Sequence, residues 1–391
     1  MAGVIVLAFN LRGAITSLPP LFPELASSLH LSSATIATLA ATPVLCFAAF
    51  SGVAAPLSRR YGEERVLLAA LVFLGVGLLS RAALPSVLLF PGTVLAAAAI
   101  ALMNVLLPSL VKRRDPARAG LLLGTYLLAL AAGAILGSLL AVPLFQASGG
   151  SVPLALGIWA LPVVAGVLAW LPQWRFRTVP AGVPPSGQRP LLKVSRYALA
   201  WQVMGFMGLQ SLIYYATLSW MPTLFRDRGA DPVHAGTLLA VMNLGNAVTA
   251  LLIPMLAHRT KDQRWLIAGT VAISAVGLAG AWFAPLGSAP VWMVLLGLGQ
   301  GAALGLAIYF TIARAPNAVV SASLSAFAQG TGYLVAAAGP LAVAFLHSAT
   351  GSWTVPVVAL LGVLAVELAT GLLAGRPVTL PEAPGVNAAP G

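Results

Sequence analysis

The chain has 391 residues, of which 59% are apolar and 8% are charged, and its formal net charge is +12. An ordinary soluble domain carries about 25% charged residues, so this composition excludes a soluble globular protein and indicates a membrane protein. The single cysteine, Cys46, excludes an internal disulfide. The first residues lack a basic region and a small-residue cleavage site, so we expect no signal peptide.

Hydrophobic segments long enough to cross a bilayer recur along the whole chain. A hydrocarbon core about 30 Å thick is crossed by about 18 or more apolar residues in a helix. The segments are continuously apolar and rich in Gly and Ala, which favours packed helices over the alternating strands of a barrel. We therefore predict an all-α polytopic membrane protein with twelve transmembrane helices, over residues 3–23, 34–57, 66–84, 87–111, 119–143, 153–172, 198–222, 235–257, 265–284, 291–313, 320–346 and 354–374.

The basic residues are distributed unevenly between the predicted connections. Most of the 21 Lys and Arg residues fall in the even-numbered connections and the C-terminal tail, whereas Arg81, Arg226 and Arg228 fall in odd-numbered ones. By the positive-inside rule, this asymmetry predicts a multi-pass protein of the cytoplasmic (inner) membrane with both termini in the cytoplasm. The net positive charge therefore reflects the orientation of the protein in the membrane. We expect no nucleic-acid partner.

Arg12 stands inside the first predicted helix, near the membrane midplane. A charge at that depth costs about 2.5 to 3.5 kcal/mol on insertion scales, so its side chain needs a partner or a wet cavity. An anionic substrate fits the guanidinium fork, while snorkelling or bonding to helix-end carbonyls is the structural alternative. Thr16 lies four residues further and can face the same side. Asn10 is turned by about 200°, so we expect it to bond to a neighbouring helix.

Other polar and aromatic residues fall inside the later helices. Gln210 and Tyr214 are four residues apart and share a face in the seventh helix, and Gln329 and Tyr333 repeat this spacing in the eleventh. Unpaired polar groups are costly in apolar surroundings, so each amide contacts either substrate or another helix. The candidate substrate-binding residues are Arg12, Thr16, Asn104, Phe206, Gln210, Tyr214, Asn243, Gln300, Tyr309, Gln329 and Tyr333.

Few titratable groups could couple transport to protons. Glu367 lies inside the last helix and Glu24 closes the first, and His234 and His347 lie near helix ends. Proton-coupled carriers usually need a titratable group within the membrane. We take Glu24 and Glu367 as coupling candidates, with Glu24 preferred because it ends a helix that we expect to line the cavity. The coupling ion itself stays open.

A basic segment rich in Pro and Gly separates two halves of the chain. Residues 173–196 contain no acidic residue and are predicted to form a flexible cytoplasmic linker. The segment "LSRRYGEER" at 57–65 is echoed 199 residues later by "LAHRTKDQR" at 256–264. We predict an N-terminal six-helix bundle over 1–172, the linker over 173–196, a C-terminal six-helix bundle over 197–376 and a tail over 377–391.

Several motifs resemble those of one transporter superfamily. "LSRRYGEER" is similar to the charged motif that major facilitators place between their second and third helices, with Arg59 where the family usually has Asp. More specifically, "NLRGAITS", "NVLLPSLVKRR", "GLQSLIYYATLSWMP" and "AQGTGYLVAAAGPLAVAFLHSATGSW" resemble the cyanate permease and 2-nitroimidazole transporter branch. This resemblance implies two pseudo-symmetric six-helix repeats with a substrate site between them near the midplane.

Together these patterns predict a secondary active or facilitated transporter that works by alternating access. The expected substrate is a small polar solute, above all a small monovalent anion such as cyanate, with a proton or counter-ion as a possible coupling partner. Planar nitroaromatics such as 2-nitroimidazole, or drugs for efflux, are alternative substrates. A membrane receptor or scaffold that does not transport is the more remote alternative.

Motifs for enzymes, cofactors and metals are absent from the sequence. It contains no Cys and His metal spacing, no phosphate-binding glycine loop after a strand and no catalytic triad that the helices could assemble. The glycine-rich segment "GLGQGAALG" at 297–305 is expected to form a helix contact surface instead. We therefore expect neither an enzyme nor a cofactor or metal site.

Overall fold

The computed structural model describes residues 2–114, 119–175 and 194–381, which form helices and no strand. The helices in chain order are α1 (Ala2–Thr16), η1 (Pro19–Leu21), α2 (Phe22–Leu29), α3 (Ser33–Phe50), η2 (Ser51–Val53), α4 (Ala54–Tyr61), α5 (Glu63–Ala83), α6 (Pro85–Arg114), α7 (Ala119–Ala147), α8 (Val152–Gly157), α9 (Ala160–Trp170), η4 (Leu171–Arg175), α11 (Ala198–Asp227), α12 (Pro232–His258), α13 (Arg264–Phe283), η5 (Leu286–Ser288), α14 (Ala289–Ala313), α15 (Ala318–Thr350) and α16 (Thr354–Ala374).

Eleven helical segments in the described part of the chain are long and apolar enough to cross a membrane. The helix α11 is 30 residues long and lies among them, although its Gln, Ser, Thr and Tyr residues make it more polar. Each of the twelve predicted helices coincides with one of these eleven segments or with α11. The all-α polytopic fold predicted from hydropathy is therefore confirmed.

Three of the predicted helices are interrupted, which hydropathy did not indicate. The first breaks after Thr16, because Pro19 and Pro20 lack the N–H groups that would continue the backbone ladder. The second passes through the 3₁₀ turn η2, and the sixth is split between α8 and α9. In the sixth, Pro162 provides no N–H to the carbonyl of Ile158, so the α-helical ladder cannot run through unbroken.

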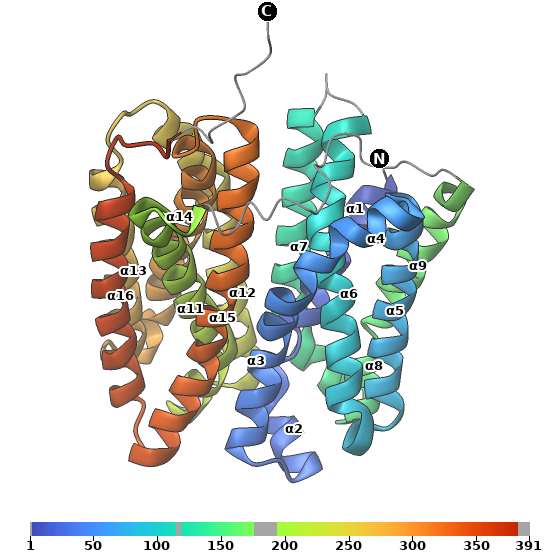
Figure 1. Ribbon diagram of the computed structural model, residues 1–391. Coiled ribbons are helices and arrows are strands. Elements are labelled where there is room, and N and C mark those ends of the chain that lie inside the picture. Colours follow the sequence, from blue (N-terminus) through green and yellow to red (C-terminus); the bar gives the residue numbers. More distant parts are fainter. Residues whose placement is uncertain (1, 115–118, 176–193, 382–391) are drawn as a thin grey trace, which may run out of the picture.

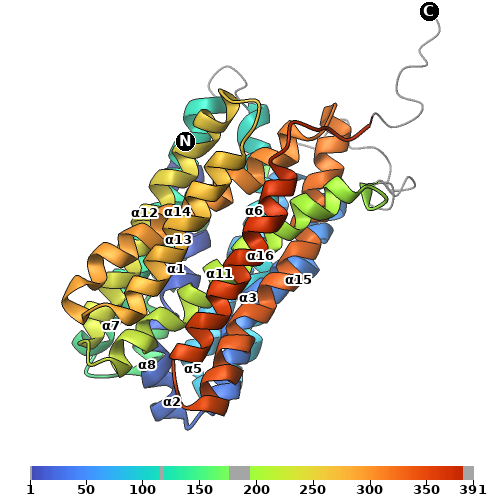
Figure 2. The same cartoon turned by 90° about the vertical axis from the view of Figure 1, so that its left-hand side faces the viewer.

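The helices form two groups that follow the order of the chain. Helices up to residue 175 pack on one another, as in the pairs α1 with α7 and α5 with α6, and the later helices do the same, as in α11 with α15 and α12 with α14. Of the predicted linker, residues 176–193 lie outside the described residues, as do residues 382–391 of the predicted tail. Figures 1 and 2 both show the start of α1 and the end of α16 at one end of the molecule, and α2 at the opposite end.

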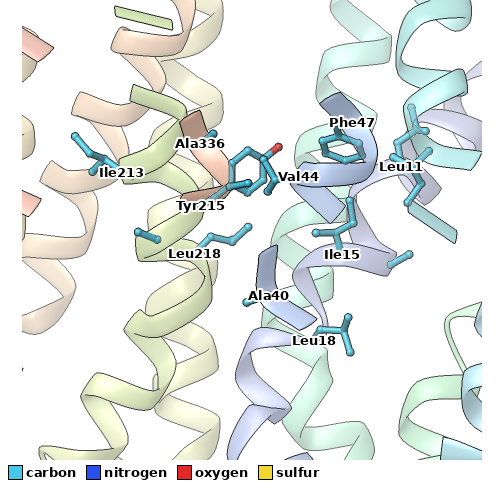
Figure 3. Packing of buried hydrophobic residues seen from close by; sticks show 14 of the residues in the cluster. Leu11, Ile15, Leu18, Ala40, Val44, Phe47, Ile213, Tyr215, Leu218 and Ala336 are labelled. Atoms are coloured by element: carbon cyan, nitrogen blue, oxygen red, sulfur yellow. The ribbon is translucent and has the colours of Figure 1, made fainter. Parts of the chain in front are cut away.

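The two groups touch through α3 against α15 and α7 against α12. At the centre of this contact, the Phe47 ring of α3 lies 5.8 Å from the Tyr333 ring and 6.5 Å from the Tyr215 ring, measured between ring centroids. Figure 3 shows Tyr215 reaching toward Val44 and Phe47 from the other group of helices. An aromatic and aliphatic seam therefore joins the two groups next to the cavity described below.

Glycines set the close packing of α14 against α12. A Cβ atom at Gly297 would lie 2.2 Å from the carbonyl oxygen of Met242, and one at Gly301 would lie 2.0 Å from that of Asn246. Real Cβ atoms do not approach backbone atoms so closely, so only glycine fits at these positions. The predicted helix contact surface over residues 297–305 is confirmed.

Candidate functional site

A central cavity of about 400 Å³ lies between the two groups of helices. Its walls come from α1 and α7 of the first group and from α11, α12, α14 and α15 of the second. Its polar lining residues are Arg12, Gln210, Ser211, Tyr214, Tyr215, Asn243, Asn246 and Tyr333. Its apolar lining residues are Leu127, Leu130, Ala131, Ala134, Ala247, Ala250, Leu251, Pro254, Leu304, Gly305 and Ile308.

Arg12 is the cationic group of this cavity. Its electrostatic neighbours are the phenols of Tyr214, Tyr215 and Tyr333 from the opposite group of helices. Its Nη1 atom is buried without a hydrogen-bond partner, and no Asp or Glu is among the lining residues. The cavity therefore presents a guanidinium group with a free donor and no protein counter-ion.

Asn243 links three helices at the cavity wall. Its Oδ1 atom accepts a hydrogen bond from the Tyr214 hydroxyl at 3.2 Å, and its Nδ2 atom donates to Ser138 Oγ of α7 at 3.0 Å. The second bond joins the two groups of helices across 105 residues of sequence. Asn243 therefore positions the Tyr214 phenol while it ties α12 to α7.

Gln210 and Tyr214 share the face that their spacing predicted, and both line the cavity. The Gln210 side chain is nearly buried, and its Nε2 atom donates to Ser211 Oγ at 2.7 Å. This face of α11 thus offers both an amide and a phenol to the cavity.

The remaining candidates lie outside the lining of this cavity. Thr16 is fully buried and its hydroxyl donates to the Arg12 carbonyl of its own helix. Gln329 donates to Ser325 Oγ at 2.7 Å, and Gln300 is buried with neither amide atom bonded. The rings of Phe206 and Tyr309 both pack against the ring of Phe310. The last candidate, Asn104, is half-buried.

Asn10 contacts a neighbouring helix, as its rotation away from Arg12 predicted. Its Nδ2 atom donates to the carbonyl oxygens of Val6 in its own helix and Pro162 in α9, at 2.8 and 2.9 Å. The side chain is almost completely buried. Asn10 therefore joins α1 to α9 and takes no part in the cavity.

The two coupling candidates have different surroundings. Glu24 Oε1 of α2 accepts a hydrogen bond from Arg226 Nη1 of α11 at 2.7 Å, an ion pair between the two groups of helices. Glu367 is buried in α16, and its Oε2 atom has no hydrogen-bond partner. Neither residue lines the cavity.

Contacts between the two groups close the end of the molecule that carries α2, called here the closed end. The Phe22 ring of α2 packs on the Trp220 ring of α11 at 6.1 Å, next to the pair of Glu24 and Arg226. Within the second group, Trp220 Nε1 donates to the carbonyl of Pro340 in α15 at 2.9 Å, which holds the Trp220 ring in place. The lining residues of α12 and α14 instead run toward the ends of these helices at the opposite end, called here the open end.

Sequence reasoning did not select three polar residues that line the cavity, namely Ser211, Tyr215 and Asn246. The tyrosine pair in "IYYAT" and the spacing of Asn243 and Asn246, three residues apart, were the available signals. The apolar half of the lining had no such signal, because apolar residues occur throughout every helix.

The sequence also matches a known family over most of its length. Residues 4–340 match the Major Facilitator Superfamily. This chain belongs to the Major Facilitator Superfamily. The transporter resemblance inferred from the motifs is therefore confirmed.

Individual relatives and solved structures agree with this assignment. The chain is 39% identical to a 2-nitroimidazole transporter of Escherichia coli strain K12, over 96% of this chain and 95% of that protein. It is 29% identical to the cyanate transport protein of the same organism, over 90% of each chain. A bacterial homolog of the human lysosomal transporter Spinster, solved inward-facing and unoccupied, is similar in fold with a TM-score of 0.78, 16% identity and 96% of each chain covered.

Proposed function

We propose that this transporter carries a small monovalent anion, the class to which cyanate belongs, and that Arg12 binds the anionic group. The observation that carries the proposal is the guanidinium group of Arg12, which faces the cavity with a free donor and no carboxylate beside it. A buried charge without a counter-ion is costly, so an anionic substrate supplies the missing partner. The name of the cyanate transport protein among the relatives supports this substrate class.

The arrangement of the two groups supports transport by alternating access. Contacts seal the closed end, while the cavity lining extends toward the open end. The excess of basic residues in the connections at the open end favours the cytoplasm for that side and for both termini. In this proposal the structure is the inward-open state in the cytoplasmic membrane, and rocking of the two groups exposes Arg12 to the other side.

Glu24 is the better-supported coupling candidate. Its partner Arg226 belongs to the other group of helices, so any opening of the closed end separates the pair. Glu367 has no such link to the movement, because it lies within the second group and away from the cavity.

A planar nitroaromatic is the second candidate substrate. The relative named as a 2-nitroimidazole transporter and the three tyrosine rings around Arg12 favour it. Drug efflux and a receptor or scaffold role have no residue in the cavity that favours them specifically.

Substitution of Arg12 tests the proposal. Removal of a hydrogen bond to a charged group costs about 1.5 to 3 kcal/mol, which is roughly 10-fold to 150-fold in affinity. We expect Arg12→Gln to weaken cyanate binding to purified protein by that factor and to abolish cyanate uptake into proteoliposomes. Arg12→Lys keeps the charge but loses the fork, so its affinity should lie between those of the wild type and Arg12→Gln.

The matched control is Asn10→Ala, on the same helix but bonded away from the cavity. It should bind cyanate as the wild type does once folded protein is matched in amount. Wild-type cyanate affinity in Arg12→Gln would make Arg12 structural, and binding of 2-nitroimidazole alone would move the proposal to the neutral substrate.

A further inference from the structure

The cavity has two chemically different parts along its length. Arg12 and its surrounding tyrosines and amides form one part, called here the polar pole. The second part is an apolar wall of residues contributed by both groups of helices, and it includes Leu127, Leu130, Ala247, Leu251, Leu304 and Ile308.

The apolar wall extends from the polar pole toward the open end. On α12 the lining begins at Asn243, beside Tyr214, and continues to Pro254. The eleven residue steps from Asn243 to Pro254 correspond to about 16 Å at the helical rise of about 1.5 Å per residue. A molecule bound to Arg12 by one end therefore has its other end against apolar side chains.

The volume of the cavity exceeds the needs of a triatomic anion. One water molecule occupies about 30 Å³ in the liquid, and a triatomic anion is only slightly larger. Such an anion would leave most of the 400 Å³ to water held against an apolar wall. The cavity instead has the size and the mixture of apolar lining and few polar groups that are typical of sites for organic ligands.

The charge of the lining limits the charge of the ligand. Arg12 is the cationic side chain among the residues that line the cavity, so a second negative charge on the ligand would find no partner there. The phenols of Tyr215 and Tyr333 also line the cavity beside Arg12 and can donate further hydrogen bonds to a carboxylate on it. The polar pole therefore matches one carboxylate group.

We infer that the preferred substrate is a monocarboxylate with an apolar body such as an aromatic ring, with its carboxylate on Arg12 and that body against the apolar wall. This inference rests on the proposed function, since it assumes that the cavity binds an anion. It goes further by requiring an apolar body, which cyanate lacks. A tenfold gain in affinity needs only about 55 Å² of buried apolar surface at about 25 cal/mol per Å².

Three probes of known chemistry test the inference on the wild-type protein. Benzoate has both parts, cyanate has the charge without the ring, and benzamide has the ring without the charge. We expect calorimetric titration of the purified protein to give a dissociation constant for benzoate at least tenfold lower than for cyanate and for benzamide. Equal or tighter binding of cyanate overturns the inference, and equal binding of benzamide overturns the role of the charge.

Two substitutions on one helix locate the ring. Ala247 lines the cavity, whereas its neighbour Val248 is 42% exposed on another face of α12. Ala247→Phe should fill the space beside the apolar wall and weaken benzoate at least tenfold, a larger loss than it causes for cyanate. Val248→Phe adds a ring outside the cavity and should change neither. Unchanged benzoate binding in Ala247→Phe overturns the placement of the ring.

Arg12→Gln separates failure of this inference from failure of the proposed function. It should weaken benzoate and cyanate alike. If neither anion binds the wild type, or if both bind Arg12→Gln as well as the wild type, the proposed function fails and the inference fails with it. If both anions need Arg12 but cyanate is preferred, only the inference fails. The wild-type comparison of the three probes decides the preference even where a variant does not fold.

Discussion

The ion pair between Glu24 and Arg226 should control how often the closed end opens. The pair joins α2 to α11, with 2.7 Å between Oε1 and Nη1, and its side chains are 14% and 21% exposed. Separation of the two groups at this end must break it, whereas movements within either group leave it intact. The free energy of this ion pair therefore adds to the free-energy difference between the inward-open and outward-open states.

The size of the effect follows from the chemistry of the pair. A hydrogen bond to a charged group contributes about 1.5 to 3 kcal/mol, and these side chains are more buried than those of a typical surface pair. Loss of that contribution should shift the ratio of the two states by roughly 10-fold to 150-fold toward outward-open. Glu24→Ala and Arg226→Ala should produce similar shifts, because each removes the same bond.

Distance measurements between spin labels report this shift. Ser28 of α2 and Ser348 of α15 are exposed near the closed end, and they can carry the labels after Cys46→Ala removes the native thiol. We expect a longer-distance population to grow in either single variant. The exchanged pair, Glu24→Arg with Arg226→Glu, should restore the wild-type distribution.

A second ion pair provides the matched control. Arg264, the first residue of α13, and Asp262, just before it, lie 3.8 Å apart and about half exposed within the second group. Asp262→Asn should leave the label distances unchanged. A wild-type distribution in Glu24→Ala would show that the pair does not hold the closed end, and the reasoning would be refuted.

Two further predictions concern stability. Asn10→Ala removes one hydrogen bond within α1 and one from α1 to α9, so thermal unfolding should show a loss of about 1 to 3 kcal/mol while ligand affinity stays unchanged; a large affinity loss would place Asn10 in the site. Gly301→Ala forces α14 away from the Asn246 backbone and should lower both the melting temperature and ligand affinity. Gly362→Ala has open space around the new methyl group and should not lower the melting temperature, so an equal loss in both variants would contradict the packing argument.

Arg12 shows how far sequence reasoning reaches into the site. Its depth in an apolar helix identified it as a candidate site residue, because the cost of an isolated charge depends on local sequence and membrane depth alone. In the structure it lines the central cavity. Gln210 and Tyr214 were found in the same way, from a helical spacing that puts both on one face. Gln329 gave the same signal with Tyr333, and Gln300 stood as a lone amide in an apolar helix, yet neither lines the central cavity.

The sequence by itself determined the number, length and order of the membrane helices, the intramembrane charge and the family. These properties follow from hydropathy, helical periodicity and motifs, all of which are local along the chain. Only the tertiary structure decided which polar residues converge, because the rotation of each helix depends on the neighbours it packs against. The bond from Asn243 to Ser138 and the pair of Glu24 with Arg226 join residues 105 and 202 positions apart, and no local pattern encodes such contacts. The apolar wall was likewise invisible, since a residue that faces a cavity and one that faces lipid can have the same side chain.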